Sequence, residues 1–203
     1  MPVPDRKLSK NFSLSEFLYS STAQRFPEIL RDQNEPSDNV ISNLSYMCNM
    51  CLQPIRETFN YPIRITSGYR CEVLNTKVGS TNRSQHLYGQ AVDCTVSDRF
   101  LTSSRSLSIR EKIEGIILEK TGKPIRNDVN ANYYLFAYVC LRRNRFDVDQ
   151  VIHEYGYRAG RPAWVHIACS PSPTNKGQIL AFGQHFEGAI DRPDLVDALA
   201  YGV

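Results

Sequence analysis

Residues 65–96, ITSGYRCEVLNTKVGSTNRSQHLYGQAVDCTV, contain the motifs from which the fold and the candidate site of the chain can be inferred. They contain His86 and Asp93, and a further histidine, His166, lies far downstream in the segment Trp164-Val165-His166-Ile167. Two imidazoles and one carboxylate are a ligand set that Zn²⁺ accepts readily. Three protein ligands leave a fourth tetrahedral position for water, which is typical of catalytic rather than structural zinc. The sequence therefore offers these three side chains as one candidate zinc site.

Two predicted strands enclose this stretch. Residues 63–66 alternate and are rich in β-branched side chains, which is typical of a strand. Residues 91–96 follow Gly89, which permits a turn, and read as a second strand. Asp93 would project from this second strand. One or two helical turns are expected between the strands, at residues 72–78.

Helical patterns precede the first strand. Ser13 and Glu16 form a capping box, which begins a short helix. Apolar side chains recur at three- and four-residue steps over residues 37–59 and predict a longer helix. Pro54 lies inside this pattern and should kink the helix or divide it into two segments. Residues 20–39 are polar and are predicted as loop.

The second half of the chain predicts two helices and a hairpin. Residues 106–120 are amphipathic, and residues 132–143 also read as a helix, although their Tyr, Phe and Val content would suit a strand. Residues 149–154 and 163–168 read as antiparallel strands, and residues 178–182 as an edge strand. The expected fold class is α+β, with helices packed on a small, largely antiparallel β-sheet.

Composition and charge limit the classes of function. The 203 residues fit one domain, and 41% apolar residues are enough for a sizeable core. The net charge is only +3 and the basic residues are scattered, so no nucleic-acid partner is expected. The chain has no run of about 18 apolar residues, so no membrane span is expected. Its start lacks the apolar segment of a signal peptide, so the protein is expected to be made in the cytoplasm.

A chain without a signal peptide disfavours disulfides among the six cysteines, and the sequence leaves open whether any of them pair. Cys48-x-x-Cys51 could be half of a zinc knuckle or a redox pair. It lies inside the apolar pattern of the longer helix, and no second CxxC completes a tetrahedral site. We therefore interpret both cysteines as small core residues.

Three motifs resemble those of the zinc D-Ala-D-Ala carboxypeptidase family. They are SGYR at 67–70, the frame from Ser84 to Asp93, and Trp-Val-His at 164–166. This family shares the Hedgehog/DD-peptidase fold with D-Ala-D-Ala dipeptidases, L-alanyl-D-glutamate endopeptidases and the Hedgehog signalling domain. FSLSEF at 12–17 and PIRITSGYR at 62–70 are similar to segments of its small phage- and prophage-encoded members. The resemblance runs from about residue 12 to residue 178.

The polar start of the chain and the extent of the resemblance predict a division of the chain, and the resemblance implies a metal site. The division is a loose N-terminal segment at 1–11, a zinc peptidase domain at 12–182 and a C-terminal tail at 183–203. One Zn²⁺ would be held by His86, Asp93 and His166. The ion would lower the pKa of a bound water from about 15.7 toward neutrality. The two histidines that match no motif, and are expected to be non-ligands, are His153 and His185.

The resemblance also implies roles around the metal. Arg70 would face the substrate and the developing oxyanion, for which its planar, permanently charged guanidinium is suited. The competing interpretation of Arg70 is a surface salt bridge. Ser84 and Gln85 are expected to bind substrate or to brace the ligand histidine. Tyr69 and Trp164 are interpreted as core aromatics rather than substrate platforms.

The general base is expected on an acidic strand before the last histidine. In the dipeptidase branch a glutamate lies three residues before that histidine, but Ala163 takes this position here. Glu154 matches the terminal glutamate of the corresponding strand in the phage-type branch. If Ile152 opposes His166 in the hairpin, Glu154 and His166 share one face of the sheet. A one-residue slip would bring Asp149 to that face instead, which makes Asp149 the alternative base.

The implied function is zinc-dependent hydrolysis of peptidoglycan stem peptides, by a D-Ala-D-Ala carboxypeptidase or an L-Ala-D-Glu endopeptidase. The setting would be a phage-type lytic or entry enzyme, which reaches the bacterial cell wall after lysis or from a phage particle. Phage virion proteins are then candidate partners. One alternative is a virion or structural protein that retains the fold with a non-catalytic zinc site. Another is a Hedgehog-like binding module.

Overall fold

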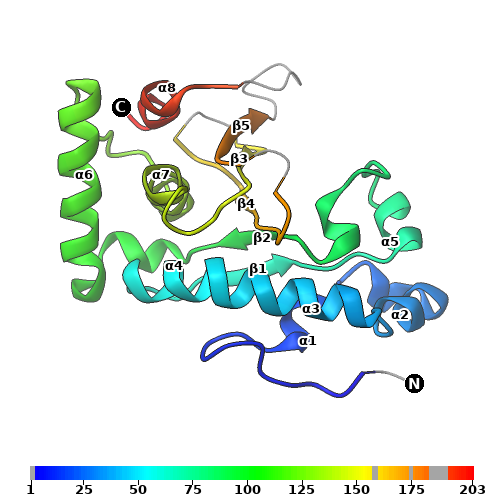
Figure 1. The fold of residues 1–203 in the computed structure, drawn as a ribbon. Helices are drawn as coiled ribbons and strands as arrows, with labels where there is room; N and C mark the ends of the chain where they lie inside the picture. The colour runs from blue at the N-terminus through cyan, green and yellow to red at the C-terminus, as the bar shows by residue number, and fades with distance from the viewer. Residues whose placement is uncertain (1–2, 157–159, 174–175, 183–191) are drawn as a thin grey trace.

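A five-stranded sheet brings distant segments of the chain together (Figure 1). The computed structural model describes residues 3–156, 160–173, 176–182 and 192–203. The strand order is β1-β2-β4-β3-β5, and every pair is antiparallel except β3 with β5. The α+β class and the edge strand at 178–182 are thus confirmed. The strands are β1 (Arg64–Ser67), β2 (Ala91–Thr95), β3 (Gln150–Glu154), β4 (Trp164–Ala168) and β5 (Gln178–Phe182).

Helices fill the connections between the strands. The segment at 132–143, for which a strand was an alternative, is helical as α7. The α-helices are α1 (Leu14–Leu18), α2 (Pro27–Gln33), α3 (Asp38–Met47), α4 (Gln53–Thr58), α5 (Glu72–Lys77), α6 (Leu107–Thr121), α7 (Ala131–Arg142) and α8 (Leu195–Ala200). The 3₁₀ turns are η1 (Ala23–Arg25), η3 (Gln85–Tyr88), η4 (Asp98–Leu101) and η5 (Ser104–Ser106), and η2 (Cys48–Leu52) is a π-helix.

The prediction of a loop over residues 20–39 is wrong. This segment contains η1, α2 and the first residues of α3. Pro27 lies in the first turn of α2, where its missing N–H would have no partner in the helix in any case. Ala23 and Ile29 bury their side chains in a small separate cluster with Cys71 and Leu74. So few buried positions produce no helical periodicity, and the segment therefore reads as polar loop.

The long helix is interrupted where Pro54 predicts an interruption. α3, η2 and α4 follow one another without a break, and the π-helix η2 ends directly before the turn that contains Pro54. A proline has no N–H and crowds the carbonyl four residues earlier, so regular α-geometry cannot continue through it. Cys48 and Cys51 are buried in the hydrophobic core with free thiols, which confirms their interpretation as core residues.

One face of the sheet packs in the hydrophobic core, and the opposite face carries polar side chains. Val92, Cys94 and Val165 lie in the hydrophobic core, with side chains of α3, α4 and α7. Asp93 and His166 alternate with these residues and therefore point to the opposite face. The core thus anchors the two strands that position the polar face.

Both ends of the described chain pack against this core. Leu8 is buried in it, and α8 buries Ala198 and Leu199 against α6 and α7. These contacts reach beyond the expected 12–182 domain on both sides. Across the described residues, no helix combines the length and the apolar character needed to cross a bilayer.

Candidate metal centre

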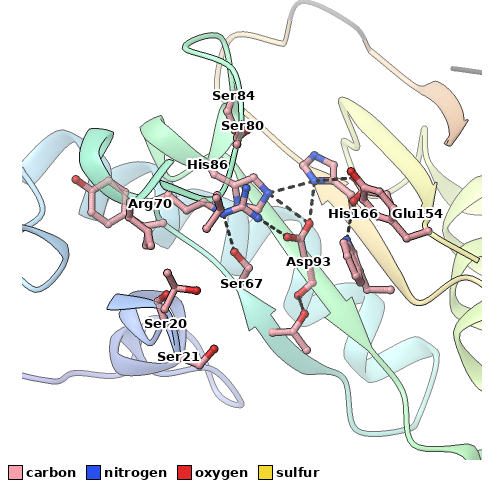
Figure 2. Close-up of a pocket in the computed structure, with 18 of the residues that line it drawn as sticks. Ser20, Ser21, Ser67, Arg70, Ser80, Ser84, His86, Asp93, Glu154 and His166 are labelled. Atoms are coloured by element: carbon pink, nitrogen blue, oxygen red, sulfur yellow. Dashed lines mark hydrogen bonds and ion pairs between the residues drawn. The ribbon is translucent and has the colours of Figure 1, made fainter. Parts of the chain in front are cut away.

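Three side chains from distant parts of the chain converge on the polar face of the sheet (Figure 2). His166 Nδ1 lies 3.1 Å from Asp93 Oδ1 and 3.3 Å from His86 Nε2, and the last two atoms are 3.4 Å apart. All three residues are buried. Among the described residues, no other group of His, Cys, Asp or Glu side chains has the spacing of a metal site.

The donor atoms fit a tetrahedral zinc ion. Ligands about 2.0–2.1 Å from a tetrahedral centre lie about 3.3–3.4 Å from one another, close to the three separations here. Two imidazole nitrogens and one carboxylate oxygen are also the donor types that zinc prefers. Three ligands leave one coordination position for water or substrate, as in hydrolytic zinc sites.

The protein holds His86 in the tautomer that a metal requires. His86 Nδ1 lies 2.6 Å from the carbonyl oxygen of Gly68, which can only accept, so Nδ1 carries the proton. The lone pair of the neutral ring is then on Nε2, the atom that faces Asp93 and His166. Gly68 packs so closely on α1 that a Cβ there would lie 2.6 Å from the carbonyl oxygen of Phe17. The SGYR and FSLSEF segments therefore meet directly behind His86.

Sheet pairing orients the other two ligands. Asp93 is the register partner of His166 across β2 and β4, and of Ser67 across β1 and β2. A bulge between Ile65 and Ser67 moves Ser67 to the level of Asp93; in a regular strand it would share the core face of Ile65. Within the described residues, the buried Nε2 of His166 has no hydrogen-bond partner. Asp93 and His86 are thus the neighbours that fix its ring.

Arg70 binds the outer oxygen of Asp93. Its Nη2 lies 2.6 Å from Asp93 Oδ2, and its Nε donates to Ser67 Oγ at 2.9 Å. Asp93 thus directs Oδ1 to the metal site and Oδ2 to a permanent cation. Burial raises the pKa of Asp93, but His86 and His166 outweigh it and hold this pKa well below its usual range. The expected substrate-facing role of Arg70 is therefore joined by a contact that braces a metal ligand.

Glu154 lies beside the metal site. Ile152 pairs with His166, as expected, so Glu154 and His166 share the polar face, and Glu154 Oε1 lies 3.9 Å from His166 Nδ1. The other carboxylate oxygen, Oε2, accepts from Trp164 Nε1 at 2.7 Å. Burial raises the pKa of Glu154 to about 7, with the Asp93 charge as a further cause. A buried carboxylate with such a pKa can accept and return a proton near neutral pH.

The register excludes the slip that would bring Asp149 and His153 to the polar face. Asp149 is fully buried and is not among the residues that line the cleft. Its Oδ2 accepts from Gln85 Nε2 at 2.6 Å, which ties the turn before His86 to the sheet. His153 packs on the core side against the ring of Phe136. His185, the other expected non-ligand, lies outside the described residues.

The metal site opens into a cleft of about 620 Å³. Arg70, Ser84 and Glu154 line it, whereas Gln85 does not. Figure 2 shows Ser20 and Ser21 on one side of the site and Ser80 and Ser84 on another. The lining residues not anticipated from sequence include Tyr19, Ser20, Ser21, Thr22, Ser80, Tyr155 and Phe182. They come from loops and an edge strand, where spacing alone gives no signal.

Converging histidine and aspartate side chains, a neighbouring carboxylate and a cleft are compatible with a zinc metallopeptidase. The chain belongs to the peptidase M15 family, because the sequence model of the family described as Peptidase M15 matches residues 11–123. The match includes Arg70, His86 and Asp93 and ends before Glu154 and His166. Membership of this family makes the protein a zinc metallopeptidase, and the family acts on peptidoglycan. A comparison with curated proteins found no match.

Proposed function

We propose that this protein hydrolyses the stem peptides of peptidoglycan with one Zn²⁺ bound by His86, Asp93 and His166. One observation carries the proposal: three donor atoms 3.1–3.4 Å apart lie in a cleft of about 620 Å³, with Glu154 Oε1 3.9 Å from the nearest ligand nitrogen. When bound, zinc polarises a peptide carbonyl and activates water at neutral pH.

The side chains around the ligands divide the remaining work. Glu154 takes a proton from the attacking water and returns it to the leaving amine. Arg70 holds Asp93 in place and adds positive charge beside the carbonyl oxygen, where negative charge develops. Ser84 binds the peptide in the cleft. Gln85 and Asp149 brace the turn that carries His86, a role supported by their 2.6 Å hydrogen bond.

Two peptide bonds are candidates, the terminal D-Ala-D-Ala bond and the L-Ala-D-Glu bond. The cleft has lining residues from both the N-terminal loops and the β3–β5 edge, which would give a peptide contacts on both sides of the candidate metal site. We infer a phage-type lytic or entry enzyme that acts on the bacterial wall after lysis or from a particle, with virion proteins as partners. The support is the likeness of FSLSEF and PIRITSGYR to segments of phage-encoded members.

Digestion of purified cell walls tests the function. Zinc-loaded wild type and His86→Ala are incubated with peptidoglycan, and the products are analysed by mass spectrometry. Loss of one terminal D-alanine identifies a carboxypeptidase, and release of peptides that begin with D-Glu identifies an endopeptidase. Either product should be absent with His86→Ala. A wild type that binds zinc tightly but releases no peptide would overturn the proposal in favour of a structural role.

A further inference from the structure

We propose that Trp164 is a positioning residue, whose indole N–H fixes the Glu154 carboxylate so that one oxygen faces the metal site. The proposal rests on the role of Glu154 in the proposed function. Sequence alone suggests that Trp164 is a core aromatic. The described hydrophobic core, however, does not include Trp164, which lines the cleft instead.

The two side chains meet because of strand register. Glu154 and Trp164 are direct partners on β3 and β4, and Ala163 N–H donates to the Glu154 carbonyl at 2.8 Å. Trp164 Nε1 donates to Glu154 Oε2 at 2.7 Å, a charge-assisted hydrogen bond when the carboxylate is ionised. Because Oε2 is occupied, Oε1 is the oxygen left to face His166. Without the indole, the carboxyl group could rotate and present either oxygen, or neither, to the site.

The indole is itself held by neighbouring rings. Tyr155 packs on Trp164 with ring centroids 5.0 Å apart, and Phe182 meets Tyr155 edge-on at 5.4 Å. The Tyr155 N–H donates to the carbonyl of Phe182 at 2.9 Å. Tyr155 has φ +49°, a left-handed conformation that costs a residue other than glycine about 1–2 kcal/mol. The packed ring of Tyr155, which is tied to Phe182, therefore limits the orientations open to the indole.

An isosteric replacement tests the hydrogen bond in the whole enzyme. The chain contains one tryptophan, so global incorporation of β-(3-benzothienyl)alanine changes Trp164 alone and exchanges its N–H for sulfur. We expect kcat to fall about 10-fold or more with KM within about 2-fold, because positioning acts on the reacting group and not on substrate binding. In the Glu154→Gln background the same replacement should change kcat less than about 2-fold, because the group it positions is already lost.

A second readout needs no metal and no activity. The single indole gives one ¹H–¹⁵N signal, which should exchange slowly with solvent in the metal-free protein. In Glu154→Ala the acceptor is absent, and we expect exchange to accelerate about 10-fold or more. An indole signal unchanged by Glu154→Ala would overturn the proposal, whatever the folding of the analogue.

The two proposals can fail separately. If Glu154→Gln keeps wild-type activity, the assignment of Glu154 as base is wrong, and the role of Trp164 falls with it. If Glu154→Gln is inactive but the benzothienyl protein has wild-type kcat, only the positioning role is overturned. Equal losses from the replacement in both backgrounds would also overturn it, because they would show that Trp164 acts independently of Glu154.

Discussion

Asp93 and His166 are direct register partners on β2 and β4, and Asp93 Oδ1 lies 3.1 Å from His166 Nδ1. The pairing brings together Asp93, which lies inside the matched family segment, and His166, which lies 73 residues after Asp93 and outside that segment. The sheet thus fixes two of the three candidate ligands, and the η3 turn supplies the third, His86. Substitutions that disturb the pairing of Asp93 with His166 should therefore weaken metal binding.

Arg70→Lys should weaken zinc binding about 10–100-fold, as is usual when a residue that orients a metal ligand is lost. A lysine can offer one point charge to Asp93 but cannot also donate from a fixed fork to Ser67. Zinc affinity is measured by competition with a chromogenic chelator. Arg64→Lys, at an exposed position in β1 of the same SGYR-containing segment, is the matched control and should bind zinc like wild type. Equal affinities for Arg70→Lys and Arg64→Lys would contradict the bracing role.

Gly68→Ala should destabilise the protein by about 1–3 kcal/mol, because its Cβ would lie 2.6 Å from the Phe17 carbonyl oxygen and the backbone would have to shift. The shift would also move the carbonyl that orients His86. Gly115→Ala in α6 is the control, since nothing lies within 4 Å of its Cβ, and it should stabilise by about 0.5–1 kcal/mol. Urea unfolding measures both, and a neutral Gly68→Ala would refute the close-packing argument.

The ligand segments could be predicted from sequence because they combine local motifs with simple register. His86 and Asp93 lie in one frame, and alternation along β3 and β4 brings Glu154 to the face of His166. A period of two leaves only two choices of face for β3, one with Glu154 and one with Asp149 beside His166, and the observed pairing of Ile152 with His166 selects Glu154.

Other parts of the site could not be predicted from spacing. The bulge at the end of β1 pairs Ser67 with Asp93, and Arg70 binds both residues, but this bulge has no local signature in Ile65-Thr66-Ser67. Ser20 and Ser21 reach the cleft through the packing of η1 and α2, which bury too few apolar residues to show periodicity. Tertiary packing, and not local preference, determines these positions.

Glu154→Gln should change the pH dependence of stability in the metal-free protein. Burial raises the pKa of Glu154 from 4.5 to about 7 on folding, so its stabilising contribution is present below pH 4.5 and is lost as pH rises to about 7. Glutamine carries no charge and avoids this loss. Relative to wild type, the variant should thus gain on the order of 2 kcal/mol between pH 4.5 and pH 8.

Urea midpoints of both chelator-treated proteins at the two pH values measure this difference. A difference that does not change with pH, or that favours wild type at pH 8, would show that Glu154 is not held in a desolvated site.

The cysteines should be unreactive in the native protein. All six are buried, and burial raises the pKa of thiols such as Cys48 and Cys140, so few thiolates form. A thiol-specific reagent at pH 8 should react slowly with the folded chain and with six thiols after denaturation. Rapid reaction of a pair in the native state would instead indicate an accessible redox or metal site.

Zinc stoichiometry, measured by mass spectrometry of the dialysed protein, tests the central claim most directly. The compared proteins are wild type, Asp93→Ala, His166→Ala and, as a control, the double variant Cys48→Ala/Cys51→Ala. We predict one zinc per chain in wild type and in the cysteine variant, and close to none in Asp93→Ala and His166→Ala. Full zinc occupancy in His166→Ala, or loss of zinc only in the cysteine variant, would contradict the account.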